Sequence, residues 1–374
     1  MNIYLFTDLR FTASPTPTGV GKHIIHMAGG LNAINGNHLE VLAARDQAGT
    51  DGRLPPGNAL SYLPSRRMPL SRKAAEAIWT LAKHPIADRW CDGADWVYCP
   101  KNDIIPLKKI KYAVTIHGAH ELDPNMPQKA GLNAALNRWR KRTQYNYMCR
   151  RADAILVVSE FLKSQVIEWF HADPDKITVV GNGIDPCFYE EGKKPDVGMS
   201  SDTPYVICVG GLNFLDGGDR ALTVAGLLRK ANSTIKVLVA GWQHDKEKVA
   251  VAKTLGNVDL LGYVPSDRLA PLMKNSIALL YLTRYETFGM AAAEAMAAGT
   301  PVVTCRSTAV PEIVGDAGIY VDPEKPQEAA DAILELSSCG LKRAEYIARG
   351  KKIAAMHTWE ACVTRLHRAL SGGR

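Results

Sequence analysis

Short apolar, β-branched runs alternate with helical patterns along this chain, and the alternation constrains the fold more than any other feature. The strand-like runs of the first half are IYLFT (3–7), LEVLAA (39–44), YAVTIH (112–117), AILVVS (154–159) and ITVVGN (177–182). The helical patterns between them cover 20–35, 71–84, 128–151 and 160–171. Strands that alternate with helices in this way predict a parallel sheet with helices on both faces.

The alternation stops once and then restarts. The stretch CFYEEGKKPDVGMSSDTP carries charge, Gly, Pro and Ser without apolar periodicity, which is typical of a linker. The strand-like runs beyond it are YVICVGG (205–211), IKVLVAG (235–241), VDLLGYV (258–264), IALLYLT (277–283) and PVVTC (301–305). The helical patterns beyond it cover 219–230, 326–337, 341–356 and 358–370.

The pattern therefore predicts an α/β protein with two Rossmann-like, doubly wound domains. A chain of 374 residues is long enough for two cores of ordinary size. The expected parts are a first domain over residues 1–185, a linker over 186–203, a second domain over 204–356 and a C-terminal helix over 357–374 that packs back on the first domain. Because open sheets bind ligands beyond the carboxyl ends of their strands, we expect the two domains to face each other across a ligand-binding cleft.

Composition places the chain among globular proteins, with 46% hydrophobic and 22% charged residues. No apolar run approaches the roughly 18 residues that cross a bilayer, and the start MNIYLFTDLRF lacks the basic and apolar regions of a signal peptide. We therefore expect a cytoplasmic protein. The eight cysteines are scattered, with no CxxC pair and no His at metal spacing, which favours reduced structural thiols.

The net charge of +7 is concentrated in places. The stretch NRWRKRTQYNYMCRR (137–151) holds six basic residues, all within 138–151, and no acid, with Trp139, Tyr145 and Tyr147 interleaved. Basic and aromatic side chains together suit an anionic membrane surface, so attachment to the inner face of a membrane is one interpretation. A solvated helix face is the other, and the residues leave both open. Nucleic acid is not expected as a partner because no nucleic-acid-binding motif accompanies the charge.

Two acids stand out in RYETFGMAAAEAMAAGTPVV, where nearly all other residues are small or apolar. Glu286 lies in the loop after a buried strand, and Glu294 lies inside the helix that follows. The backbone N–H groups of Phe288, Gly289 and Met290 are expected to be unpaired at the helix start, where they would suit a phosphate. The alternative is that the helix dipole alone favours the first acid and that Glu294 is merely exposed.

The segment from Tyr281 to Pro323 resembles the carboxyl-terminal signature of the retaining glycosyltransferases of family 4, which have the GT-B fold. Glu286 and Glu294 match that family's motif of two glutamates separated by seven residues, and GTPVV and STAVPEIVGDAGIYVDP follow in the expected places. The stretch RADAILVVSEFLKSQVIEWFHADPDKITVVGNGID and the glycine-rich TGVGKHI resemble parts of the family's first domain. Only 45–110 is hard to match.

The resemblance implies that the second domain binds a nucleotide sugar and that the first binds the acceptor. Glu286 would face the transferred sugar and stabilise positive charge at its anomeric carbon, and Glu294 would accept hydrogen bonds from the ribose hydroxyls. Phe288, Gly289 and Met290 would offer backbone contacts to sugar and phosphate. The segment with Tyr263 and Val264 would flank the base.

The first domain contributes two further features to the implied site. His117 in VTIHGAH matches a histidine beside the donor sugar, although a structural role or, with His120, a metal site are the alternatives. A metal is not expected because no third ligand stands at readable spacing. Gly19 and Gly21 in TGVGK are expected beside the donor phosphate or the acceptor. TGVGK is no P-loop, because Thr16 stands where the first glycine should be and His23 replaces the Ser or Thr.

The chain departs from the family pattern after the first strand of its second domain. Most relatives carry an Arg and a Lys there, which neutralise the donor diphosphate. Here Gly211, which would still line the donor phosphate, stands in the place of the Arg, and Leu215 and Asp216 stand where a basic pair is usual. Losing two positive charges weakens stabilisation of the leaving group. The basic residues that could replace them are Arg10, Lys22, Arg220 and Arg284.

These features give two main functional hypotheses. The first is a retaining, metal-independent glycosyltransferase without a cofactor, which moves a sugar from a donor such as a UDP- or GDP-hexose to a hydroxyl of a glycan or lipid-linked saccharide in bacterial surface polysaccharide synthesis. The second is a degenerate GT-B protein that binds a nucleotide sugar or a partner without efficient catalysis. An epimerase or phosphorylase on the same fold is a third and weaker alternative. Sugar, base, acceptor and oligomeric state are not specified by the sequence.

Overall fold

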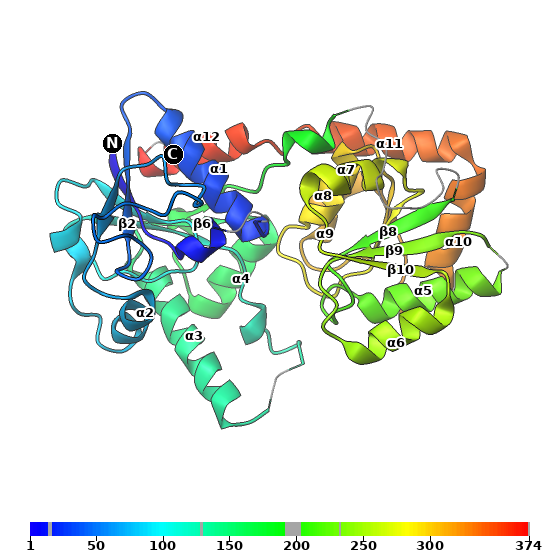
Figure 1. Cartoon of the computed structure of the whole chain (residues 1–374), viewed down its shortest axis with the longest axis horizontal. Helices are drawn as coiled ribbons and strands as arrows, with labels where there is room; N and C mark the ends of the chain where they lie inside the picture. The colour runs from blue at the N-terminus through cyan, green and yellow to red at the C-terminus, as the bar shows by residue number, and fades with distance from the viewer. Residues whose placement is uncertain (14–16, 128–129, 191–202, 232, 373–374) are drawn as a thin grey trace. The chain divides into compact units, whose positions relative to one another are not determined.

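The chain forms two compact units in a computed structural model that describes residues 1–13, 17–127, 130–190, 203–231 and 233–372 (Figure 1). Unit 1 comprises Met1–Gly183 and Trp359–Arg374, and unit 2 comprises Ile184–Thr358. The last segment of the chain therefore belongs to the same unit as the first. Most of the expected linker, residues 191–202, lies outside the described residues.

Unit 1 is built on a seven-stranded parallel sheet with the order β3-β2-β1-β4-β5-β6-β7. Its strands are β1 (Asn2–Leu5), β2 (His38–Ala43), β3 (Ser65–Arg67), β4 (Trp96–Cys99), β5 (Lys111–Ile116), β6 (Ala154–Val157) and β7 (Ile177–Val179). Its helices are α1 (Gly19–Ala33), α2 (Arg72–Leu81), α3 (Leu132–Arg151), α4 (Glu160–Phe170) and α12 (Trp359–Leu370). The strand order reverses beside β1, as in doubly wound folds, so the loops after β1 and β4 diverge and leave room for a ligand.

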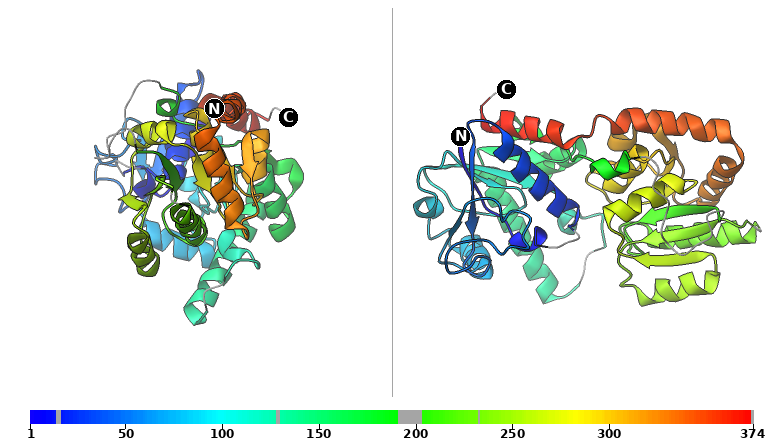
Figure 2. Two further views of the ribbon diagram at one scale, coloured as in Figure 1. Left: turned by 90° about the vertical axis from the view of Figure 1, so that its right-hand side faces the viewer. Right: turned by 45° about the horizontal axis from the view of Figure 1, so that its top comes forward.

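One face of this sheet is covered by α1 and α12, which lie side by side in both views of Figure 2. Their buried side chains, among them Met27, Leu31 and Leu366, form one core with Leu5 and Val41 of the sheet. Helices α2 and α3 lie on the other side of the sheet (Figure 1). Both faces are thus buried, which explains why the central strands read as continuous apolar runs.

Unit 2 is built on a six-stranded parallel sheet with the order β10-β9-β8-β11-β12-β13. Its strands are β8 (Tyr205–Val209), β9 (Lys236–Ala240), β10 (Val258–Gly262), β11 (Leu279–Tyr281), β12 (Val302–Thr304) and β13 (Gly318–Tyr320). Its helices are α5 (Gly218–Lys230), α6 (Lys246–Leu255), α7 (Ser266–Asn275), α8 (Met290–Ala297), α9 (Val310–Val314), α10 (Pro326–Ser338) and α11 (Gly340–Ala354). Helices α5, α6 and α10 lie on one side of the sheet and α7, α8 and α11 on the other (Figure 1). The reversal of strand order is beside β8, so the loops after β8 and β11 diverge at a second ligand-binding position.

The structure confirms the doubly wound α/β class and differs from the sequence-based expectation in particular elements. Three strands, β3, β4 and β13, and three helices, α6, α7 and α9, were not expected. The expected strand over 277–283 is only Leu279–Tyr281. The described part of the expected linker includes a 3-10 turn, Pro186–Phe188, whose buried Phe188 packs with unit 2.

Candidate active site

Glu286 lies in the loop between β11 and α8, and its carboxylate accepts three hydrogen bonds. Its Oε2 accepts from the Tyr281 hydroxyl at 2.5 Å, and its Oε1 accepts from the backbone N–H groups of Thr287 at 3.0 Å and Phe288 at 3.4 Å. The Glu286 N–H donates to Thr308 Oγ1 at 2.8 Å. Burial and the charge of Glu286 raise the pKa of Tyr281 well above its usual value, so the phenol keeps its proton and donates. The carboxylate is therefore fixed in one orientation.

The sequence predicted that the Phe288 N–H, at the start of α8, has no hydrogen-bond partner, and the structure differs. That N–H contacts the Glu286 carboxylate, and the Phe288 ring is buried against His357, with ring centroids 5.4 Å apart. Gly289 caps the helix with φ at +96°, a left-handed conformation that a residue with a side chain rarely adopts. Met290, the first residue of α8, is half-buried.

Glu294 is buried within α8, with only 5% of its surface exposed. The alternative of a merely exposed acid is therefore wrong. The other residues of this turn are alanines that are buried as well, so α8 approaches its neighbours closely on every side. A carboxylate in such surroundings must have polar partners, because burying an uncompensated charge is costly.

Asp216 brings a second acid close to Glu286. It follows β8 in the loop where the family resemblance led us to expect a basic residue, and the Asn213 side-chain amide donates to its carboxylate. Burial, opposed by the Asn213 hydrogen bond and reinforced by the charge of Glu286, raises the pKa of Asp216 to about 6. The loop after β8 therefore adds negative charge at neutral pH.

The two arginines of unit 2 that could replace the missing cations are already paired with acids. Arg284 donates two hydrogen bonds of 2.7 Å to Asp219, and its guanidinium lies 4.0 Å from the Phe214 ring centroid. Arg220 pairs with Glu324 at 2.8 Å and donates to the Leu282 carbonyl at 3.1 Å. Neither arginine is available as a phosphate clamp without giving up a carboxylate partner.

Gly211 cannot carry a basic side chain in this backbone. Its φ is +81°, and a Cβ atom there would lie 2.1 Å from the carbonyl oxygen of Trp242. Its N–H is bonded to the Ala240 carbonyl at 3.0 Å, so it does not offer the phosphate contact expected of it without breaking that bond. The missing Arg of the family pattern thus has a steric cause.

Tyr263 and Val264 follow β10 and are half-buried. The Tyr263 ring lies 6.1 Å from that of Trp242, which is 64% exposed and stacks on His244. Sequence reasoning missed Trp242, although its position directly after β9 is the signal that could have identified it.

In unit 1, His117 follows β5 and its proton position can be inferred. Its Nε2 lies 2.9 Å from the Pro100 carbonyl, and since a carbonyl only accepts, Nε2 carries the hydrogen. Burial, together with the charge of Lys101, lowers the pKa of His117 to about 4. The imidazole is therefore neutral at pH 7, and its Nδ1 is a hydrogen-bond acceptor. The ring of buried His23 crosses it edge to face, with centroids 4.6 Å apart.

Gly19 and Gly21 form the first turn of α1. The Gly21 N–H donates to Thr18 Oγ1, the N-cap, at 3.3 Å, so this donor is already used in the described structure. Thr16, which stands where a P-loop would have its first glycine, lies outside the described residues.

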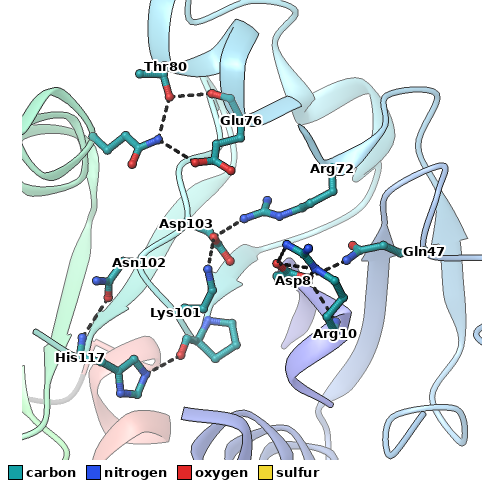
Figure 3. Close-up of polar contacts among 12 residues, drawn as sticks. Asp8, Arg10, Gln47, Arg72, Glu76, Thr80, Lys101, Asn102, Asp103 and His117 are labelled. Atoms are coloured by element: carbon teal, nitrogen blue, oxygen red, sulfur yellow. Dashed lines mark hydrogen bonds and ion pairs between the residues drawn. The ribbon is translucent and has the colours of Figure 1, made fainter. Parts of the chain in front are cut away.

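His117 also lines a cavity of about 390 Å³ that lies entirely within unit 1. Charged side chains from several elements and loops converge there: Asp8 and Arg10 after β1, Arg72 on α2, and Lys101 and Asp103 after β4 (Figure 3). Arg140 of α3 also lines the cavity. Among these residues, sequence reasoning considered only His117 and Arg10 for the sugar-binding site, and it assigned Arg140 to a basic stretch suited to a membrane surface. Asp103 was missed because β4 was not recognised as a strand.

Among the described residues, no group of three or more His, Cys, Asp and Glu side chains is placed to hold a metal ion. Within the same residues, no helix combines the length and the apolar character needed to span a bilayer.

Sequence comparisons identify relatives for most of the chain. Residues 17–187 match the family model described as Glycosyltransferase Family 4, and residues 190–353 match the one described as Glycosyl transferases group 1. O-antigen chain mannosyltransferase B of Escherichia coli is 26% identical over 332 residues, which is 83% of this chain and 81% of that protein. For several other curated relatives, the matched segment spans about half of their length.

Solved structures show the same architecture. Sucrose-phosphate synthase from Thermosynechococcus elongatus has a TM-score of 0.72 at 16% identity, covering 100% of both chains. HepE from Anabaena in complex with UDP-glucose has a TM-score of 0.71 at 17% identity, covering 99% of both chains. These likenesses show that the chain has the GT-B fold. Together with the two family models, they show that the chain belongs to the group 1, family 4 glycosyltransferases.

Proposed function

We propose that the protein is a retaining glycosyltransferase that moves a hexose from a nucleotide sugar to a hydroxyl of a glycan or lipid-linked saccharide. The observation that carries this proposal is the fixed carboxylate of Glu286, held by the Tyr281 hydroxyl and two backbone N–H groups beyond the end of β11. A preoriented carboxylate stabilises positive charge as the bond from the anomeric carbon to the leaving phosphate breaks. The E. coli relative, named for O-antigen chain synthesis, supports a role in surface polysaccharide synthesis.

The proposed reaction uses no protein nucleophile. The electron pair of the breaking bond goes to the phosphate oxygen, the acceptor oxygen attacks the same face of the sugar, and its proton passes to that phosphate oxygen. His117, neutral and with Nδ1 as an acceptor, would receive a hydrogen bond from a sugar hydroxyl. Buried Glu294 would hold the ribose, and Trp242 beside Tyr263 offers an aromatic surface for the base.

A screen of UDP-, GDP- and ADP-sugars tests the proposal, with binding followed by thermal stability and turnover by slow donor hydrolysis. We expect one nucleotide class to raise the melting temperature and at least one of its sugars to be hydrolysed. Stabilisation without hydrolysis or transfer would instead favour a degenerate, non-catalytic binder. That second function is favoured by one observation, the acidic loop of Asp216 with its paired arginines.

We also propose that the acceptor is membrane-borne and that α3 docks on an anionic bilayer. Leu132, Leu136 and Trp139 are 85%, 59% and 54% exposed and recur at a spacing that places them on one helix face. Exposed Arg142 and Arg150 extend this basic helix, which contains no acid. Each basic residue near such a surface contributes about 1 kcal/mol.

Vesicle sedimentation tests this docking. Replacing Leu136 and Trp139 by Ser is expected to weaken binding to phosphatidylglycerol vesicles about tenfold at low salt, because apolar insertion is lost. Leu341→Ser, at an 87% exposed leucine on α11, is the matched control and should change nothing. Equal binding by all three proteins, or none by the wild type, would contradict the proposal.

A further inference from the structure

We propose that the cavity of unit 1 binds one anionic group, a phosphate or a carboxylate, carried by the saccharide acceptor. This inference rests on the proposed function, because it assigns the acceptor to unit 1. It adds a chemical requirement, a negatively charged substituent on the acceptor. The argument depends on the side chains at the base of the cavity, called here the charged cluster: Asp8, Arg10, Arg72, Lys101 and Asp103 (Figure 3).

The cluster contains more cations than carboxylates. Arg10 donates a bidentate pair of hydrogen bonds to the Asp8 carboxylate, from Nε to Oδ1 at 2.9 Å and from a terminal nitrogen to Oδ2 at 2.6 Å. Arg72 and Lys101 both donate to one oxygen, Oδ1 of Asp103, the lysine at 3.1 Å. Within the cluster, three cations thus face two carboxylates, which leaves one positive charge on the cavity lining. Exposed Asp46, which does not line the cavity, accepts from the Arg72 backbone N–H at 2.7 Å and offsets part of the Arg10 charge from outside. His117 is neutral and does not alter this balance.

Four of the five side chains lie where water shields charge poorly. Those of Asp8, Arg72 and Asp103 are 5%, 8% and 2% exposed and that of Lys101 is 21% exposed, whereas that of Arg10 is 72% exposed. Despite burial, the hydrogen bonds and charges of Arg10 and Arg72 lower the pKa of Asp8 to about 2, so both arginines face an ionised group. An uncompensated charge in a partly buried site is costly unless an anion is bound there.

Donors and acceptors of the cluster remain unused in the described structure. Arg72 Nε and Asp103 Oδ2 are buried without a hydrogen-bond partner among the described residues. An ammonium group has three N–H donors, and one of those on Lys101 is assigned, to Asp103. Lys101 Nζ also lies 5.2 Å from the centroid of the Phe11 ring, which keeps the lysine on the cavity wall. Lys101 is therefore the group best able to receive an anion.

The other charges around the cavity are balanced in pairs. Arg140 donates to Glu76 at 2.6 Å, and Lys141 donates to Glu121. The cavity volume of about 390 Å³ falls within the range of roughly 300–1,000 Å³ for small-ligand sites. Polar lining suits a sugar ring, and the one surplus cation suits a single anionic substituent. Since His117 lines the same cavity, the anion would sit in unit 1 near the residue expected to face the donor sugar.

The test compares three probes on the full chain: glucose 6-phosphate, glucuronate and neutral methyl glucoside. We expect at least one charged probe to bind at least tenfold more tightly than methyl glucoside in NMR titrations at low ionic strength. Binding of glucose 6-phosphate alone or glucuronate alone identifies the group as phosphate or carboxylate. Equal affinity for all three probes, or no binding of either charged probe, would overturn the inference.

Variants locate the binding. Lys101→Gln should lower the affinity for the charged probe about tenfold. Lys101→Arg should keep most of the affinity because it keeps the positive charge. Lys73→Gln, on an exposed lysine of α2 outside the cavity, is the matched control and should stay within twofold. Equal losses in Lys101→Gln and Lys73→Gln would overturn the inference. Nucleotide-sugar binding by the same samples reports separately on the proposed function, which fails if no nucleotide sugar binds to any of them.

Discussion

The two units carry opposite charge at the positions where their folds leave room for ligands. In unit 1 the charged cluster, which lies after β1 and β4 and at the start of α2, holds three cations and two carboxylates. In unit 2 the loops after β8 and β11 hold Asp216 and Glu286, and the nearby Arg284 is bound to Asp219. For an enzyme that handles a nucleotide diphosphate, the cations would be expected in the second unit.

This difference teaches that similar sheets do not imply similar electrostatics. Both sheets reverse their strand order beside the first strand, so the site positions are fixed by topology. The charges are fixed by the loops, where Gly211 excludes a basic side chain for steric reasons. If unit 2 binds the donor phosphate, as we propose, it would do so through backbone N–H groups and neutral donors, or by freeing an arginine from its carboxylate partner.

Replacing Glu286 is expected to have the largest effect. Glu286→Gln should lower the rate of transfer at least about 10³-fold, roughly 4 kcal/mol, because the amide cannot stabilise positive charge at the anomeric carbon. Nucleotide affinity should change less than twofold, since the amide oxygen can still accept from Thr287 N–H. Steady-state transfer kinetics and nucleotide titration measure the two effects.

The control for this prediction is Glu247→Gln, at an exposed acid on α6, which should retain full activity. Comparable activity in Glu286→Gln and Glu247→Gln would show that the acidic site of unit 2 is not catalytic. The contrast between the units would then be structural only.

The elements that were predictable from sequence are those with strong local signals. Strands such as β1 and β6, buried on both faces, show continuous apolar runs, and α1 and α4 show helical periodicity. Strand β3 has no such signal, because its three residues, Ser65 to Arg67, form a strand only through backbone pairing with β2. Strand β4 is short and lies in the stretch that is hardest to match, so its central place in the sheet was not foreseen.

The same distinction applies to the site. Glu286 and Glu294 lie in one short segment, so their spacing could be interpreted from the sequence alone. The pairing of Arg72 with Asp103 and the approach of Asp216 to Glu286 are tertiary contacts between distant segments. No local pattern encodes such contacts, and here they decide the charge of each site.

Breaking the charged cluster should produce the next largest effect, on stability. Asp103→Asn removes the carboxylate shared by Arg72 and Lys101 and leaves a buried guanidinium without its ion-pair partner. We expect the free energy of unfolding to fall by about 3 kcal/mol in urea titrations followed by circular dichroism. Asp51→Asn is the control, because Asp51 and Arg53 are an exposed pair 3.9 Å apart, and it should cost less than about 0.5 kcal/mol. A loss of unfolding free energy no greater than that of the control would show that the Asp103 carboxylate does not stabilise the charges of Arg72 and Lys101.

The smallest of the three effects is a pH-dependent gain of stability from Asp216→Asn. The pKa of Asp216 is raised from 3.8 to about 6 in the folded chain. Below pH 3.8 the carboxyl is protonated in both states, so variant and wild type should have similar stability. As the pH rises towards 6, the unfolded chain ionises while the folded chain keeps its proton, and the wild type loses stability relative to the variant.

Above pH 6 the advantage of Asp216→Asn should therefore reach its maximum, which is at most about 3 kcal/mol for a pKa raised from 3.8 to about 6. Its amide oxygen can still accept from the Asn213 side chain, so the loop is expected to keep its shape. Thermal unfolding of both proteins at pH 3 and pH 7.5 measures the difference, and the pH 3 pair serves as the internal control. A variant that is less stable than the wild type at pH 7.5 would show that the Asp216 carboxylate is stabilising. The acidic residues of unit 2 would then help to stabilise its fold. Having Asp216 where a basic residue was expected would cost the unliganded protein no stability.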